Sequence, residues 1–409
     1  MTIELALHDP ALYAHGFPHE RFRHLRDDEP VSHHEHDRYE GGYWVVARHA
    51  DVQAVSRNAE VWRNAPSPMV ETPPGLPPDP EMDLLINLDG HEHLQMRKIV
   101  NRGFTPRRVA ALEDRLRARV DALVGALTGR ESADLVEDLA LWLPLHVIAD
   151  LLGVPEPDRR TLFEWTEQSF GFDPELGIEE RMAATSEMFA YADALSQERQ
   201  SSPQDDLLSL LLTAEVEGHR LTQFQVSTFF MLLQNAGSET TRNLITTGTL
   251  ALLEHPDQHE LLRGDAERVP LAIEELLRWS TPVMYFCRQA ERDTEIAGVP
   301  IRAGERVVLS YTSANFDDRA FEAPQRLDVS RRPNDHVAFG AGGPHFCLGA
   351  SLARLEARVM FEALLTRFEG LAVADDPATI RRVHSNFIDG FAELPVTWTS
   401  IAHGEVRAT

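Results

Sequence analysis

The sequence has little cysteine, no long apolar run and far fewer basic than acidic residues. Two cysteines in 409 residues exclude a disulfide framework and fit a reducing cytosol. The N-terminus lacks the basic and apolar regions of a secretory signal, and no stretch of about 18 apolar residues could span a membrane. A net charge of −26 argues against nucleic-acid binding, which requires a basic face. We therefore expect a cytoplasmic enzyme with no nucleic-acid partner and no membrane span.

Several common site signatures are missing as well. The sequence contains no Gly-x-Ser-x-Gly elbow, no Walker loop and no Cys-x-x-Cys pair. The run His33-His34-Glu35-His36 could bind a metal, but a solvated polar loop is the stronger interpretation. Neither these missing motifs nor the histidine-rich run therefore identifies a function.

Hydrophobic periodicity indicates a mainly helical chain. Helical spacing dominates residues 91–280, and strand-like segments occur at 43–47, 284–310 and 384–400. Breaks in the helical spacing fall at Pro106, 153–155, 173–174 and 202–203. Residues 66–80 carry seven of the 25 prolines and predict an irregular loop. No internal repeat is visible, and the sequence predicts a mainly α fold with small β-sheets.

The most informative segment is a glycine-rich loop around Cys347, which runs from Phe339 to Gly349 directly into a predicted helix. Backbone N–H groups at a helix N-terminus stabilise a thiolate, and glycines let a flat ligand approach the backbone. A thiolate held in this way can be the axial ligand of a haem iron. An isolated cysteine is more often buried and inert, and this description fits Cys287, which has no such loop.

A long helix is predicted over residues 222–254. Gly237 lies in its middle, where Gly costs about 1 kcal/mol relative to Ala, so the position needs a packing or functional reason. The Thr240 hydroxyl can donate to the carbonyl of Ala236, four residues earlier. A loosened turn beside Glu239 and Thr240 could admit water and a proton path, although ordinary helix packing is the alternative.

The Cys347 loop resembles the cysteine-ligand loop of the cytochrome P450 family, with one residue more than usual between Phe339 and Cys347. Three further segments resemble family motifs. Residues 236–242 resemble the oxygen-activation motif, whose acid and alcohol fall on Glu239 and Thr240. Residues 89–97 resemble a segment that binds the haem propionates. The last motif is a scaffolding ion pair, Glu275 with Arg278, completed by Arg331 in the segment that resembles the family's meander.

The motifs spread from residue 89 to residue 349, so the resemblance implies a single cytochrome P450 domain over residues 1–409. Its fold would hold haem b between the long central helix and the cysteine loop. Cys347 would bind the iron, Glu239 and Thr240 would be catalytic, and O2 and external electrons would be required. The residues implied in haem binding are His93, Arg97, Ala236, Gly237, Thr240, Arg288, Ala338, Phe339, Gly340, His345, Cys347, Gly349 and Ala353.

The implied function is a monooxygenase that inserts one oxygen atom from O2 into a hydrophobic small molecule, such as a sterol, terpenoid, branched lipid or polyketide-like compound. The motifs are most similar to those of bacterial members that oxidise sterol side chains, branched lipids or terpenoids. The alternatives are a haem-thiolate peroxygenase or coupling enzyme, and a non-catalytic haem sensor or carrier, which the Glu239–Thr240 pair disfavours. The implied substrate pocket comprises Leu232, Ala236, Val283, Met284, Phe286, Phe387 and Ile388.

The chain has no flavin- or nicotinamide-binding fingerprint, so its electrons must come from a partner. Ferredoxin and ferredoxin reductase are the expected donors to a monomer. Residues 93–112 contain no acidic residue and form a basic island in an acidic chain. The basic residues of this island are Arg97, Lys98, Arg102, Arg107 and Arg108. An acidic ferredoxin would be attracted to this island and repelled elsewhere.

Overall fold

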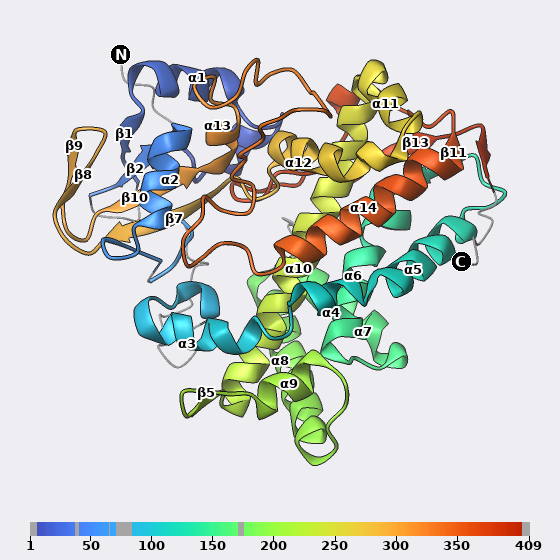
Figure 1. The fold of residues 1–409 in the computed structure, drawn as a ribbon, viewed down its shortest axis with the longest axis horizontal. Coiled ribbons are helices and arrows are strands. Elements are labelled where there is room, and N and C mark those ends of the chain that lie inside the picture. The colour runs from blue at the N-terminus through green and yellow to red at the C-terminus, as the bar shows by residue number, and fades with distance from the viewer. Residues whose placement is uncertain (1–5, 37–40, 65, 71–83, 171–175, 403–409) are drawn as a thin grey trace.

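The structure is a computed structural model that describes residues 6–36, 41–64, 66–70, 84–170 and 176–402. A five-stranded sheet with α1, α2 and α13 lies on one side, and the long helix α10 crosses the helical remainder (Figure 1). The helices are α1 (His19–Asp28), α2 (His49–Arg57), α3 (Gly90–Val100), α4 (Pro106–Ala110), α5 (Glu113–Ala126), α6 (Trp142–Leu152), α7 (Arg159–Phe170), α8 (Ile178–Ser201), α9 (Leu207–Thr213), α10 (Gln223–Glu254), α11 (Pro256–Arg263), α12 (Val269–Ser280), α13 (Tyr311–Asn315) and α14 (Ala350–Arg367). This arrangement confirms the predicted mainly α fold with small sheets. None of the helices described is long and apolar enough to cross a membrane.

The main sheet has the strand order β1-β2-β10-β7-β3. Its strands β2 and β10 run parallel, and the other neighbours are antiparallel. Its members are β1 (Val31–His34), β2 (Tyr43–Val46), β3 (Trp62–Arg63), β7 (Tyr285–Ala290) and β10 (Arg306–Ser310). The smaller sheets pair β4 (Ser132–Asp134), β12 (Ala372–Val373) and β13 (Pro395–Thr397), and separately β5 (Glu215–Val216) with β6 (His219–Arg220), β8 (Thr294–Ile296) with β9 (Val299–Ile301), and β11 (Phe368–Glu369) with β14 (Ser400–Ile401). The predicted strand regions therefore form strands, while residues 71–80 of the proline-rich loop lie outside the described part of the chain.

The helix α10 begins and packs as its sequence requires. Thr222 caps it: the Thr222 hydroxyl accepts from the Gln225 N–H at 3.1 Å, and the Gln225 side chain accepts from the Thr222 N–H at 3.0 Å. A Cβ atom on Gly237 would lie 2.5 Å from Cδ1 of Ile148 on α6. The mid-helix glycine is therefore explained by the close approach of α6.

The Cys347 loop packs against α2. Gly343 has φ +83°, and a Cβ atom there would lie 2.3 Å from the carbonyl oxygen of Ser56. The Ser56 hydroxyl donates to the Gly342 carbonyl at 2.9 Å, and the Arg57 Nε donates to the Ala341 carbonyl at 3.2 Å. Only glycine fits this contact without strain, so α2 fixes the lengthened part of the loop.

A buried ion pair joins α12 to the segment before the Cys347 loop. Glu275 accepts hydrogen bonds from Nε of Arg278 at 2.8 Å and from Nε of Arg331 at 3.0 Å. The Glu275 and Arg278 side chains are 1% and 0% exposed. Because Arg278 also donates to the Asn315 carbonyl at 2.8 Å, the cluster links three segments that are distant in sequence.

Replacing Glu275 by Ala should lower the free energy of unfolding by about 3–5 kcal/mol, because Arg278 would stay buried without its carboxylate. Urea unfolding followed by circular dichroism measures this loss. Glu393→Gln is the control, because it breaks an ion pair with Arg381 whose side chains are 40% and 71% exposed, and it should leave the transition unchanged. Equal unfolding transitions for the two variants would contradict a scaffolding role for Glu275.

Candidate functional site

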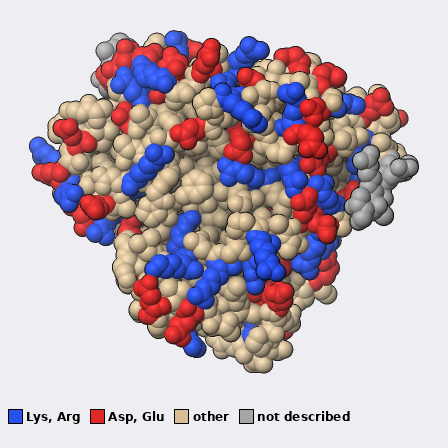
Figure 2. All heavy atoms as spheres, in the orientation of Figure 1, with Lys and Arg blue, Asp and Glu red and all other residues tan. Residues whose placement is uncertain are grey.

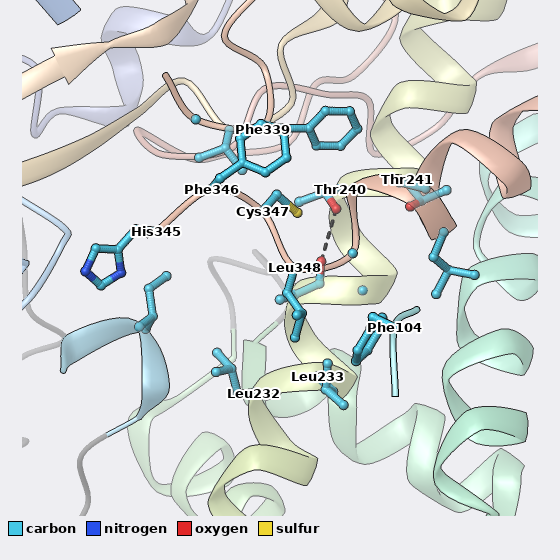
Figure 3. Close-up of a pocket in the computed structure, with 18 of the residues that line it drawn as sticks. Phe104, Leu232, Leu233, Thr240, Thr241, Phe339, His345, Phe346, Cys347 and Leu348 are labelled. Atoms are coloured by element: carbon cyan, nitrogen blue, oxygen red, sulfur yellow. Dashed lines mark hydrogen bonds between the residues drawn. The ribbon is translucent and has the colours of Figure 1, made fainter. Parts of the chain in front are cut away.

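A cavity of about 240 Å³ lies between α10, α3 and the Cys347 loop. Its walls are predominantly apolar and include Phe104, Leu232, Leu233 and Leu244. Figure 3 shows Cys347 reaching the cavity from the loop and Thr240 reaching it from α10. The cavity therefore brings a thiol and the Thr240 hydroxyl together in a space with mainly apolar walls.

Cys347 is exposed only in the sense that its side chain opens into this interior cavity. Its N–H donates to the Phe339 carbonyl at 2.9 Å, which closes the loop. Burial raises the pKa of the Cys347 thiol, while hydrogen bonds from the Gly349 and Ala350 N–H groups and the charge of Arg97 lower it. Burial is the largest effect and the pKa is raised overall, while the amides at the start of α14 act in the opposite direction and favour the thiolate.

Donor groups gather at one end of the cavity, where α3 meets the loop. The rings of His93 and His345 lie 4.1 Å apart, and Nε2 of His345 is 3.2 Å from Oδ1 of Asp89. Nε2 of His93 is buried and has no hydrogen-bond partner. Burial lowers the pKa of His93 to about 4, with smaller contributions from His345 and Arg97. His93 is therefore a neutral imidazole with hydrogen-bonding capacity left for a ligand in the cavity.

Two further predicted donors differ in position. Arg97 lines the cavity and donates to the carbonyl of Phe346 in the Cys347 loop. Arg288 is buried on β7 and is not among the cavity-lining residues; its Nη1 donates to the Cys287 carbonyl at 2.8 Å. Arg288 also contacts the Tyr311 hydroxyl, and Tyr311 lines the cavity.

The predicted catalytic pair is divided between two environments. The Thr240 hydroxyl lines the cavity and donates to the Ala236 carbonyl at 3.0 Å, the contact expected from the sequence (Figure 3). Glu239 lies outside the lining and accepts from Nη2 of Arg242 at 2.7 Å. Arg242 also lies 3.6 Å from Glu167 of α7. Burial raises the pKa of Glu239 to about 7, against a lowering by Arg242 and with a further raising by Glu167.

Sequence reasoning missed a second buried acid, Glu356 on α14. Glu356 lines the cavity, and its Oε2 has no hydrogen-bond partner. Burial raises its pKa to about 8, while a hydrogen bond with Thr241 lowers it. Its position among apolar residues, on the buried face of the helix that follows Cys347, is the signal that could have revealed it.

Some of the remaining predicted site residues line the cavity and others do not. Met284, Phe387 and Ile388 do not line the cavity. The Met284 side chain is instead buried in the core cluster that contains Tyr285 and Cys287, and Phe387 packs against that cluster. Ile388 is buried, and its backbone bridges to Val283, which does line the cavity. The other predicted pocket and cofactor residues line it, namely Leu232, Ala236, Gly237, Val283, Phe286, Ala338, Phe339, Gly340, Gly349 and Ala353.

The histidine-rich run forms no metal centre in the structure. His34 pairs with the Ser32 hydroxyl at 2.8 Å. Across the described residues, no group of three or more His, Cys, Asp or Glu side chains could hold a metal ion. The cavity at Cys347 is therefore the main candidate site.

The chain is similar to known proteins over most of its length. The family model of cytochrome P450 matches residues 166–383. The chain is 40% identical over 406 residues to a steroid C26-monooxygenase of Rhodococcus jostii, covering 97% of this chain and 85% of that relative. It is 40% identical over 369 residues to a methyl-branched lipid omega-hydroxylase of Mycobacterium bovis, covering 88% and 84%. A solved structure, the Mycobacterium marinum cytochrome P450 CYP268A2 in complex with pseudoionone, superposes with a TM-score of 0.88 at 35% identity and covers 97% of this chain and all of that one.

These similarities extend over nearly the whole chain and include the cavity described above. The activity that they share is oxidation by a cytochrome P450, with haem, O2 and electrons from outside the chain. The chain therefore belongs to the cytochrome P450 family and is a monooxygenase that acts on hydrophobic substrates.

Proposed function

We propose that this monooxygenase hydroxylates a steroid side chain or a methyl-branched lipid. The carrying observation is the apolar cavity, in which Leu232, Phe229 and Val283 offer contacts to hydrocarbon and few polar groups offer hydrogen bonds. The 40% identity to both a steroid C26-monooxygenase and a methyl-branched lipid omega-hydroxylase supports this class over smaller or more polar substrates.

The cavity residues fit haem b. Cys347 offers a thiolate to the iron, and Nε2 of His93 is a buried polar atom that otherwise lacks a partner. His345 and Arg97 add donors at the same end of the cavity, where propionate groups would bind, and Arg288 lies behind Tyr311. When bound, haem supplies the oxygen-activating chemistry, and a thiolate ligand favours O–O cleavage.

Proton supply falls to residues of α10 and α14. Thr240 presents a hydroxyl to the cavity. Glu239 is the buried acid next to Thr240 in the sequence, and Glu356 is the buried acid on the cavity wall. Because burial raises their pKa values to about 7 and about 8, both carry protons for part or most of the time at neutral pH. We assign the final positioning of the proton to Oγ1 of Thr240.

Electrons come from ferredoxin and ferredoxin reductase, which would place the monomeric enzyme in the cytoplasm with them. Support comes from the basic side chains that gather over α3 and α4 (Figure 2). Arg97 of α3 contacts the Cys347 loop, so this surface lies close to the sulfur.

Cys347→Ala should abolish the absorption band that marks thiolate ligation in the reduced, CO-bound protein, because no second thiol reaches the cavity. Cys287→Ala is the control and should keep the band, since Cys287 is buried in a core cluster and does not line the cavity. Absorption spectra of both variants measure this outcome. If the band survives in Cys347→Ala, Cys347 is not the thiolate ligand.

Thr240→Ala should consume reductant but release peroxide, with product formation about 10²–10⁴-fold slower, the usual contribution of a positioned proton donor. Thr240→Ser keeps the hydroxyl and should restore most of the product. The ratio of product to NADPH consumed measures the effect, with the haem spectrum as a check on folding. An unchanged ratio in Thr240→Ala would show that protons take another route.

Steroids with intact side chains and methyl-branched fatty acids should shift the haem Soret band on binding and yield products hydroxylated near the chain end. Unbranched acids of equal length and steroids without side chains are the matched controls and should bind more weakly. Products are identified by mass spectrometry with NADPH-driven and peroxide-driven reactions in parallel. Equal binding of all four classes would contradict the substrate proposal, and turnover with peroxide alone would favour a peroxygenase.

A further inference from the structure

The turn between β5 and β6 holds an acidic residue in an unfavourable backbone conformation. Glu217 has φ +54° and Gly218 has φ +81°, and these two residues form the whole connection between the strands. Positive φ at both positions is typical of a type I′ turn, which prefers Asn or Gly at the first position. Glu at this position costs stability that Asn would not, so a compensating contact or function is expected.

The Glu217 carboxylate reaches the basic island on α3. Oε1 of Glu217 lies 2.7 Å from Nζ of Lys98, and Oε2 lies 3.9 Å from Nε2 of His91. The neighbouring Glu215 differs: its backbone carbonyl accepts from Arg102 at 3.2 Å, but its carboxylate pairs with Arg220 inside the hairpin. Only one of the two hairpin acids therefore neutralises a side chain of α3.

The pair between Glu217 and Lys98 is easily exchanged. Its side chains are 52% and 56% exposed, and an ion pair at this exposure contributes little to stability. Leu94, one turn before Lys98, is 48% exposed and is among the few large apolar side chains on the described surface. Figure 2 shows acidic side chains near β5 beside the basic ones over α3. An exposed leucine beside exchangeable charges is a surface that a small acidic protein can cover.

We propose that Glu217 is a built-in competitor for the electron donor: it occupies Lys98 in the free enzyme, and a carboxylate of an acidic [2Fe–2S] ferredoxin replaces it on docking. The inference rests on the proposed docking of ferredoxin at α3. The chain supplies its own carboxylate to the site that the donor's carboxylates would use, so donor binding is weaker than the basic residues alone would allow. Binding of proteins with the wrong surface is weakened in the same way.

The test uses the haem-loaded full chain and a purified acidic [2Fe–2S] ferredoxin with its NADPH-dependent reductase. Glu217→Gln should lower the ferredoxin concentration for half-maximal reduction by up to about fivefold, the range that one exposed ion pair supplies, with the maximal rate unchanged. Glu217→Asn, which also suits the turn, should do the same. The gain should vanish at high ionic strength, because exposed charges are then screened.

Glu215→Gln is the matched control, since it removes the same charge from the same hairpin without freeing Lys98. An equal gain in Glu215→Gln would overturn the inference in favour of a general effect of net charge. No gain in Glu217→Gln, with weaker reduction in Lys98→Gln, would overturn the competition but keep the docking site. If neither variant changes reduction, the docking site is wrong and the inference fails with it. Substrate oxidation driven by any electron donor still tests the proposed monooxygenase function separately.

Discussion

The structure depends on holding a thiol inside the protein at the start of a helix. Burial raises the pKa of Cys347 and opposes the thiolate. The N–H groups of Gly349 and Ala350 and the charge of Arg97 offset part of this effect. Each depends on a different element: α14 supplies the amides and α3 supplies the guanidinium. The glycines at 342 and 343 let the loop lie directly on α2, so three helices together determine where the sulfur lies.

The same constraint explains the placement of buried charge. Glu275 and Arg278 are both almost fully buried, which is tolerable only because several donors surround the carboxylate. Their contacts with Arg331 and Asn334 connect α12 to the segment that leads into the Cys347 loop. Around the cavity, by contrast, buried acids are left with few partners. Glu356 has an unpaired oxygen and Glu239 has one cation, and both pKa values rise. Paired charges therefore build the frame, while the poorly paired acids are Glu356 on the cavity wall and Glu239 next to Thr240.

Much of this arrangement could be predicted from the sequence, because it is determined locally. The capping box at Thr222 and Gln225 and the apolar pattern after it place α10 to within one residue. Cys347, Thr240 and His93 carry their chemistry within short motifs, and all three line the cavity. Rotation about a helix and layering behind a sheet are determined by tertiary contacts instead. Arg242, the partner of Glu239 outside the cavity, lies 3.6 Å from Glu167 of α7, and Met284 is buried in a core cluster against which Phe387 packs. The contact of Glu217 with Lys98 joins elements distant in sequence, which no local pattern reveals.

The central claim is that Cys347 presents its sulfur to iron at the end of this cavity. X-ray absorption at the iron edge of the haem-loaded protein tests it most directly. The account predicts one sulfur neighbour of the iron in the unmodified chain, lost in Cys347→Ser and kept in Cys287→Ser. An iron environment of nitrogen and oxygen alone in the unmodified chain, or a sulfur that persists in Cys347→Ser, would contradict it.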